Sequence, residues 1–432
     1  MTAIERNAID LNDTDGFWSA SIEHRQAAFE ALREQPGLPF FPEPVLGLAP
    51  RGPGYYALTR MDDILRASRD PARFISGRGS GSAVDLPPEL ADLGQSMITM
   101  DGPRHGRLRR IVSRAFTPRM LDAVVENVAH VAAGIVDEVI GRGEFDAVAD
   151  VAAELPLRVI CDMTGVPASQ QGFVSEQTNR MLGIADPDYV VDQDDPMQVM
   201  SDASRRLSEL MLDLAAHRSA RPGDDLISTL VSAQIDGEAL SPSELASFFI
   251  LLVGAGNETT RNAISWGIEL LSRFPEQRAI WLSDLDAVTP TAVEEIVRWS
   301  TPVMFQRRTV AEQAEPAELG GQLLGPGDKI LMFYWAANRD PRHFSDPDRF
   351  DVLRSPNPHI GFGGPGPHFC LGAHLARREI SVIFRELLTR MPDLRVTGEP
   401  VRLRSALVNG IKSLPVTSTP GGSTSEVHRG AA

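Results

Sequence analysis

The stretch from Ser241 to Arg273 constrains the fold most, because it has the pattern of one very long helix. Ser241 can cap this helix, Pro242 suits its first turn, and Glu244 stands where the acid of a capping box belongs. A helix rises about 1.5 Å per residue, so this one would span roughly 45–50 Å and could cross a whole domain. Residues 248–253 are apolar on nearly every face, so we expect the middle of the helix to be buried.

Further helical patterns flank this segment, and strand-like stretches are few and short. One helix begins near Pro118, and another should open with Thr289 as its cap and Pro290 in its first turn. The strand candidates are YYALTR, ILMFYWA and the segments around Leu403 and Lys412. The sequence therefore predicts a mainly α protein with small, mainly antiparallel β-sheets.

Composition limits the function classes. The chain has 432 residues, a formal net charge of -16 and 42% hydrophobic residues, enough for a large core. The acidic balance argues against nucleic acid or an anionic membrane surface as a partner. No signal peptide or membrane span is visible, so we expect a cytoplasmic protein. We expect an N-terminal arm over residues 1–15, a single domain over 16–418 and a disordered tail over 419–432.

A glycine-rich loop delivers one of the two cysteines to the start of a helix. The run FGGPGPHFCLG covers residues 362–372, and a helical pattern follows it. The helix dipole and free backbone N–H groups would favour a thiolate at Cys370, and the glycines would let a large flat ligand approach closely. A lone cysteine before a helix is usually a core residue, but Gly, His and Gly at these offsets favour a ligand. Cys161 is expected to be a separate thiol, since cytosolic disulfides are unusual.

The polar run AGNETT interrupts the apolar middle of the long helix at residues 255–260. Gly254 and Gly256 each weaken a helix interior by about 1 kcal/mol relative to Ala, and they leave space beside the helix. A threonine hydroxyl can bond a carbonyl one turn back. The run predicts a local groove with an acid, Glu258, and an alcohol, Thr259, beside it. A helix crossing with a solvent-facing polar turn is an equal alternative.

Two further pairs stand at helical spacing. Glu295 and Arg298 are three residues apart and can form an ion pair, although such pairs are common on ordinary helices. His105 and Arg109 are four apart, hence on one face, within a basic segment of an acidic chain. A solvated basic face is the ordinary interpretation of that segment.

Together these motifs resemble those of the cytochrome P450 family, the haem-thiolate monooxygenases. The cysteine loop resembles the haem-binding signature F-G-x-G-x-H-x-C-x-G, with one extra residue after the Phe. The run AGNETT matches the oxygen-binding motif A/G-G-x-D/E-T-T/S, and Glu295 with Arg298 matches the E-x-x-R element. The motifs stand in family order over residues 101–378. The resemblance implies a cytochrome P450 fold with the long central helix lying over haem b.

The resemblance also assigns roles to individual residues. Cys370 would be the axial thiolate ligand of the iron and its only protein ligand. Thr259 would handle oxygen bound at the iron, and Glu258 would deliver protons through water. The residues expected to contact the haem propionates are His105, Arg109, Arg308 and His368.

Structural and substrate residues follow from the same resemblance. Glu295 and Arg298 would lock onto an arginine of a later loop, here Arg349, and hold the proximal side of the haem site. Apolar residues should line the substrate site of a C–H hydroxylase. The candidates are Ile98, Met100, Leu251, Gly254, Ala255, Val303 and Phe305.

Within the family, the chain is most similar to the actinobacterial ω-hydroxylases of methyl-branched lipids and sterol side chains. SFFILLVGAGNETTRNAIS, the longer cysteine loop and LARREI carry this match. Pro365 stiffens the loop, and Gly254 stands where a bulkier apolar residue is usual. The similarity implies hydroxylation of the terminal carbon of a methyl-branched lipid, isoprenoid or steroid side chain. The alternatives are a tailoring hydroxylase of a macrocycle or polyketide, a peroxide-driven peroxygenase and a non-catalytic haem sensor.

The reaction would use O2 and two electrons from another protein. The chain has no dinucleotide-binding fingerprint between a strand and a helix, so we expect a separate ferredoxin with its reductase. Arginines near the haem would form a basic patch on which an acidic ferredoxin docks. These are Arg107, Arg110, Arg114 and Arg377.

Overall fold

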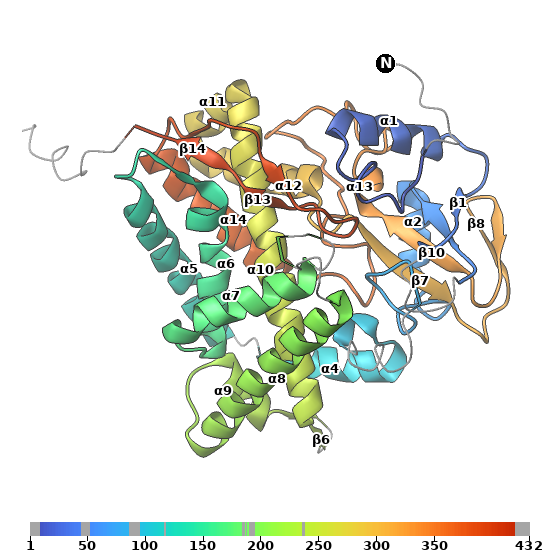
Figure 1. Cartoon of the computed structure of the whole chain (residues 1–432), viewed down its shortest axis with the longest axis horizontal. Helices are drawn as coiled ribbons and strands as arrows, with labels where there is room; N and C mark the ends of the chain where they lie inside the picture. The colour runs from blue at the N-terminus through green and yellow to red at the C-terminus, as the bar shows by residue number, and fades with distance from the viewer. Residues whose placement is uncertain are drawn as a thin grey trace, which may run out of the picture.

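The computed structural model places the long helix α10 at the centre of the molecule (Figure 1). The structure describes residues 9–44, 52–85, 96–115, 118–183, 186, 188–189, 195–235 and 238–419. Helix α10 spans Pro242–Arg273, as predicted, and its capping box is formed. The Ser241 hydroxyl accepts from the Glu244 N–H at 3.2 Å, and the Glu244 carboxylate accepts from the Ser241 N–H at 3.0 Å.

Helices make up most of the described chain. Those before α10 are α1 (Ile22–Arg33), α2 (Met61–Arg69), the 3-10 turn η2 (Met97–Thr99), α4 (Gly102–Ala115), α5 (Pro118–Val139), the π-turn η3 (Val148–Ala152), α6 (Glu154–Thr164), α7 (Ala168–Leu182), α8 (Pro196–Ala220) and α9 (Leu226–Ser232). Those after it are α11 (Pro275–Ser283), α12 (Leu285–Ser300), α13 (Tyr334–Ala337) and α14 (Ala373–Arg390). The predicted mainly α class is confirmed.

The strands are short, and the largest sheet lies to one side of α10 (Figure 1). The largest sheet has the order β1-β2-β10-β7-β3, with Phe40–Phe41, Tyr55–Leu58, Lys329–Phe333, Phe305–Val310 and Phe74–Ile75. Only the β2–β10 pair in this sheet is parallel. The smaller sheets are β11-β14-β4 (Arg395–Val396, Pro415–Thr417, Glu144–Asp146), β12-β13 (Val401–Arg402, Ile411–Ser413), β5-β6 (Gln234–Ile235, Glu238–Ala239) and β8-β9 (Ala317–Leu319, Gln322–Leu324).

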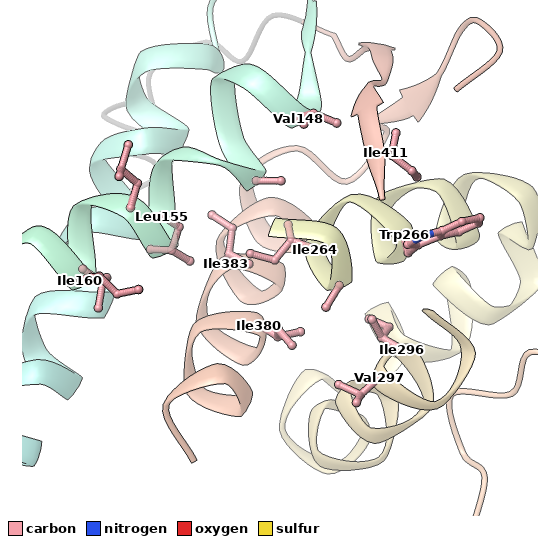
Figure 2. Packing of buried hydrophobic residues seen from close by; sticks show 14 of the residues in the cluster. Val148, Leu155, Ile160, Ile264, Trp266, Ile296, Val297, Ile380, Ile383 and Ile411 are labelled. Carbon is pink, nitrogen blue, oxygen red and sulfur yellow. The ribbon is translucent and has the colours of Figure 1, made fainter. Parts of the chain in front are cut away.

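Apolar side chains from several elements meet around the second half of α10. Figure 2 shows Ile264 and Trp266 of α10 between residues of α6, α12 and α14. The labelled partners are Val148, Leu155, Ile160, Ile296, Val297, Ile380, Ile383 and Ile411. All of them are buried, so α10 is held rigidly where it crosses the domain.

Helix α12 begins earlier than the sequence indicated. The predicted start at Thr289 and Pro290 is wrong, because Asp284 caps the helix by accepting from the Ala287 N–H at 3.0 Å. Pro290 therefore lies inside the helix. The Thr289 hydroxyl instead accepts a hydrogen bond from the Trp281 indole at 2.9 Å, a contact between α11 and α12.

The chain ends lie partly outside the described residues. Of the expected arm, Ile9 and Leu11 are buried in the main core, and the Trp18 indole donates to the Leu11 carbonyl at 2.9 Å. Of the expected tail, only Thr419 is described, and its N–H donates to Asp393 at 2.8 Å. Among the described helices, none is long and apolar enough to cross a membrane.

Candidate active site

Cys370 lies two residues before the N-cap of α14, which is Gly372. Its N–H donates to the Phe362 carbonyl at 3.0 Å, so the two ends of the loop are tied together. As a residue Cys370 remains accessible to solvent, although protein surrounds much of its thiol, whereas Cys161 on α6 is fully buried. Burial by surrounding protein raises the pKa of the Cys370 thiol, against the Gly372 N–H and the charges of Arg109 and Arg377. A bound metal would overcome this, because a coordinating thiol is deprotonated outright.

The loop glycines serve a close contact with helix α2. A Cβ on Gly364 or Gly366 would lie 2.4 Å from atoms of Ser68, too close for any side chain. Gly363 has a φ of +90°, a conformation that favours glycine. These glycines were expected to let a flat ligand approach. In the structure, Gly364 and Gly366 let the loop pack against α2.

One face of α10 carries residues that remain accessible in the middle of a buried helix. Ala255 is exposed, and Leu251 and Thr259 are partly exposed, whereas Gly254 and Glu258 are buried. Leu251, Ala255 and Thr259 are four apart, so they form one stripe along the helix. The Thr259 hydroxyl donates to the Ala255 carbonyl at 2.6 Å, the one-turn bond expected from the sequence.

The stripe lies toward the same end of the helix pair as Cys370. The Glu379 carboxyl on α14 makes a side-chain hydrogen bond with Thr260 on α10, and further along both helices a Cβ on Gly267 would meet the Phe384 ring. These contacts advance along α10 and α14 in the same direction. The residues before them, the stripe on α10 and Cys370 before α14, therefore lie at one end of this helix contact.

Glu258 is buried in a polar network beside the stripe. Its Oε1 accepts from Arg261 at 2.5 Å and from the Asn262 amide at 2.9 Å. Arg261 also donates to Asn179 of α7 at 3.1 Å, so the network reaches a second helix. Oε2 of Glu258 is buried without a hydrogen-bond partner among the described residues. Glu258 thus has one carboxylate oxygen held by two hydrogen bonds and one without a partner among the described residues.

Four donor side chains from three segments come together near the cysteine loop. The rings of His105 on α4 and His368 lie 4.3 Å apart. Arg109, one turn after His105, donates to the Phe369 carbonyl at 2.7 Å, and Arg308 of β7 is close enough to act on His105. Burial, followed by the charges of His368 and Arg109, lowers the pKa of His105 to about 4.

This cluster fits an anionic group. Asp101 is the carboxylate that faces it, with its Oδ1 3.9 Å from the His368 ring nitrogen, and the Ser76 and Gly77 N–H groups already bind Asp101. Two propionates would supply the missing negative charge to these cationic and donor groups. The donor set together with an accessible thiol therefore suits haem.

Neighbouring residues of β7 point in opposite directions because side chains alternate along a strand. Arg308 faces the histidine cluster, while Arg307 pairs with Asp85 on the other side. Gln306 shares the face of Arg308, and its buried Oε1 has no partner among the described residues. Gln306 was not among the residues predicted from the sequence, although the strand period alone indicates its direction.

The Glu295–Arg298 pair is completely buried. Arg298 binds both carboxylate oxygens of Glu295 at 2.7 and 2.8 Å and also donates to backbone carbonyls of the later loop. The predicted side-chain partner Arg349 is wrong. Arg349 contributes only its carbonyl to Arg298, and the guanidinium that reaches Glu295 at 3.1 Å belongs to Arg354. The spacing within the loop could not distinguish these two arginines.

The apolar candidates divide into two groups. Leu251, Ala255 and the partly exposed Ile98 remain accessible, and Val303 is partly exposed and bridges to Val408. The remaining candidates pack into the protein.

Met100, Gly254 and Phe305 face protein neighbours. Met100 lines a small cavity between η2, α4 and the start of α10. A Cβ on Gly254 would lie 3.9 Å from Leu182 of α7, so this position contacts α7. Phe305 packs against Phe333, with ring centroids 5.5 Å apart, inside an aromatic cluster of the large sheet. Gly254 and Phe305 thus face α7 and the aromatic cluster.

Known proteins resemble the chain along nearly its whole length. A family model described as Cytochrome P450 matches residues 197–392. A methyl-branched lipid omega-hydroxylase of Mycobacterium tuberculosis is 48% identical over 415 residues, 95% of this chain and 94% of that protein. A steroid C26-monooxygenase of Rhodococcus jostii is 39% identical over 367 residues, 84% of this chain and 75% of that protein.

A solved structure agrees with this. A Mycobacterium marinum cytochrome P450 in complex with pseudoionone has a TM-score of 0.88 and 42% identity, and the match covers 96% of this chain and 100% of that one. The similarity inferred from the motifs is thereby confirmed. Membership implies haem held by a cysteine thiolate, and the accessible thiol and the donor cluster described above suit such a group. The chain belongs to the cytochrome P450 family of monooxygenases.

Proposed function

We propose that this protein hydroxylates the terminal carbon of a methyl-branched lipid, isoprenoid or steroid side chain. The observation that carries the proposal is the stripe of Leu251, Ala255 and Thr259 on α10, at the same end as Cys370 and next to a buried acid. It would give an apolar chain a surface to lie along beside the reacting group. The names of the relatives that are 48% and 39% identical support this substrate class.

The proposed cofactor is haem b with Cys370 as its axial ligand. His105, Arg109, Arg308 and His368 would bind its propionates, which agrees with the two guanidinium charges and the two imidazole rings gathered there. Gln306 would bind the same propionates. Its amide can be turned so that the NH2, and not Oε1, points toward them and donates. When bound, haem supplies the activation of O2.

The protein side chains would manage protons and water at this site. Thr259 holds its hydroxyl proton toward the Ala255 carbonyl, so its oxygen is free to accept a hydrogen bond from the reaction site. Glu258 could pass a proton through water at its unpartnered Oε2, while Arg261 and Asn262 hold Oε1. This is general acid work by a positioned group.

Terminal oxidation requires positioning. A terminal methyl has stronger C–H bonds than the neighbouring tertiary carbon, so reactivity alone favours the wrong site. Holding the methyl close to the reacting centre can reverse that order. Leu251 and Val303 are the proposed steering residues. Phe305 is better explained by its aromatic cluster. A larger side chain at Gly254 would contact Leu182 of α7.

The electrons would come from a ferredoxin and its reductase. An open cavity of about 450 Å³ is lined by His105, Arg109, Arg110, Ser113, Arg114 and Pro367. An acidic ferredoxin would dock on its arginines. Arg107 and Arg377 were expected in this patch, but they bind Glu244 at 3.0 Å and Glu294 at 2.9 Å. Arg110 and Arg114 are therefore the main proposed contacts.

Product analysis tests the proposal. The purified protein is given a methyl-branched fatty acid or a sterol, with either a ferredoxin–reductase pair or hydrogen peroxide alone. We expect a terminal alcohol that carries one oxygen atom from labelled O2 in the ferredoxin arm, and little product in the peroxide arm. Oxidation of a macrocycle or ring carbon with no turnover of either chain would reject the lipid substrate. Efficient turnover with peroxide alone would reject the ferredoxin partner.

A further inference from the structure

We propose that Arg377, held by Glu294 against the Phe362 ring, is a positioning residue that sets the charge around Cys370 and thereby the reduction potential of the iron bound there. This inference uses the family assignment and the proposed ligand Cys370, and it does not depend on the lipid substrate.

Arg377 is fixed from two directions. Its Nε and one terminal nitrogen bind the two carboxylate oxygens of Glu294 on α12, at 2.5 and 2.9 Å. Its guanidinium carbon lies 4.3 Å from the centroid of the Phe362 ring, within the range of a cation–π contact. A planar guanidinium can make both contacts at once, which an ammonium group cannot do equally well.

Phe362 transmits this arrangement to the cysteine. Its carbonyl accepts the Cys370 N–H at 3.0 Å, so a shift of Phe362 moves the backbone that carries the thiol. Its neighbour Gly361 is pressed against α12, where an added Cβ would lie 2.7 Å from Val297. The segment before the cysteine is therefore clamped on α12 both by packing and by the Glu294–Arg377 pair.

His359 completes the attachment. Its Nε2 lies 2.8 Å from Glu294, so one carboxylate of α12 binds both the loop before the cysteine, at His359, and the first turns of α14, at Arg377. Although burial raises the pKa of Glu294, its hydrogen bonds with His359 and Arg377 lower it to about 2. Glu294 is therefore ionised near neutral pH, and its charge offsets that of Arg377.

The two partners have opposite electrostatic effects on the same site. Reduction adds an electron next to Cys370, so a nearby cation stabilises the reduced form and a nearby anion destabilises it. Arg377 is one of the cations that act on the Cys370 thiol. Loss of Arg377 should lower the potential, whereas loss of the Glu294 charge should raise it, because the Phe362 ring still holds Arg377.

The midpoint potential of the substrate-free holoenzyme, measured without ferredoxin, tests this. We expect Arg377→Gln to shift the reduction equilibrium about threefold toward the oxidised form, and Glu294→Gln about threefold toward the reduced form. Each shift is roughly 30 mV for a one-electron couple, at low ionic strength where screening is weak. Arg377→Lys keeps the charge and should shift the potential less than Arg377→Gln.

A second ion pair between the same helices provides the matched control. Asp286 of α12 and Arg385 of α14 lie 2.5 Å apart, at the end of α14 away from Cys370. Asp286→Asn and Arg385→Gln change the same charges and should leave the potential unchanged. Haem content and the absorption of the reduced carbon monoxide complex identify any variant that has lost its fold.

The outcomes separate positioning from a simple structural tie. Opposite shifts for the two Gln variants, with silent controls, support the proposal. Shifts in the same direction, or shifts no larger than those of the Asp286 and Arg385 variants, overturn it. Where Arg377→Gln fails to retain haem, Arg377→Lys and Glu294→Gln still decide, since the second must raise the potential.

Discussion

Glu379 is a buried acid whose ionisation should oppose folding. It is 2% exposed, and burial raises its pKa to about 8, with only partial relief from Thr260. The unfolded chain has a glutamate pKa of about 4.3, so the folded protein holds a proton that the unfolded chain has lost between these values. The stability that this proton uptake contributes is complete below the unfolded pKa and is lost as the pH rises through the folded pKa.

Glu379→Gln should therefore stabilise the fold increasingly as the pH rises. We expect little difference from the parent protein near pH 5, and a gain on the order of a few kcal/mol near pH 8. Urea unfolding of both proteins at the two pH values measures this. A gain that does not change with pH would show that Glu379 is not held protonated by the fold.

Sequence could identify the residues whose chemistry is local, and it missed those defined by distant contacts. Cys370 stands out because its loop and helix are contiguous, and Thr259 because its bond reaches only one turn back. Arg261 and Glu379 were overlooked, since the role of each depends on its burial or on a partner on another helix. No local pattern distinguishes a buried acid from an exposed one on the same helix.

At the scale of elements, predictions succeeded where the signal lay within the element. The bounds of α10 followed from Ser241, Pro242 and Glu244, which are all local. The start of α12 was misplaced, because Thr289 looked like a cap and is instead occupied by a contact with Trp281. The connection between α12 and its loop was misassigned for the same reason, since Arg349 and Arg354 differ only in where the folded loop places them.

The corrected connection leads to a prediction. Arg354 binds both oxygens of the buried Glu295 at 3.1 and 3.2 Å, so Arg354→Ala leaves that carboxylate with fewer donors. We expect a loss of roughly 1–3 kcal/mol in unfolding free energy, and weaker retention of haem. Arg349→Ala should have a much smaller effect, because Arg349 contributes its carbonyl. Equal losses in the two variants, measured by denaturant unfolding, would restore the original assignment.

At the scale of the whole molecule, the class could be predicted and the arrangement could not. A long apolar helix with few strands required a mainly α domain built around it. The order of the large sheet joins residues 40–41 to 329–333 through β2, and strands of two to six residues carry too little pattern to indicate such pairings. The family resemblance gave the architecture that local patterns could not supply. The expected boundaries at residues 15 and 418 stay predictions.

The identity of the thiolate ligand is the central claim, because the proposed roles of the donor cluster and of the α10 stripe depend on which cysteine binds the iron. Burial raises the pKa of the Cys161 thiol to about 12, and this cysteine is fully buried in the α6 core. Cys370 is accessible, and the charge of Arg109 from the donor cluster acts on its thiol. The chain thus offers one cysteine suited to bind iron.

The absorption spectrum of the reduced carbon monoxide complex tests this claim most directly, since a thiolate ligand gives a strongly red-shifted band. Cys370→His should retain haem and lose that band, and Cys161→Ser should leave the band unchanged. Loss of the band in Cys161→Ser, together with its survival in Cys370→Ser, would contradict the account.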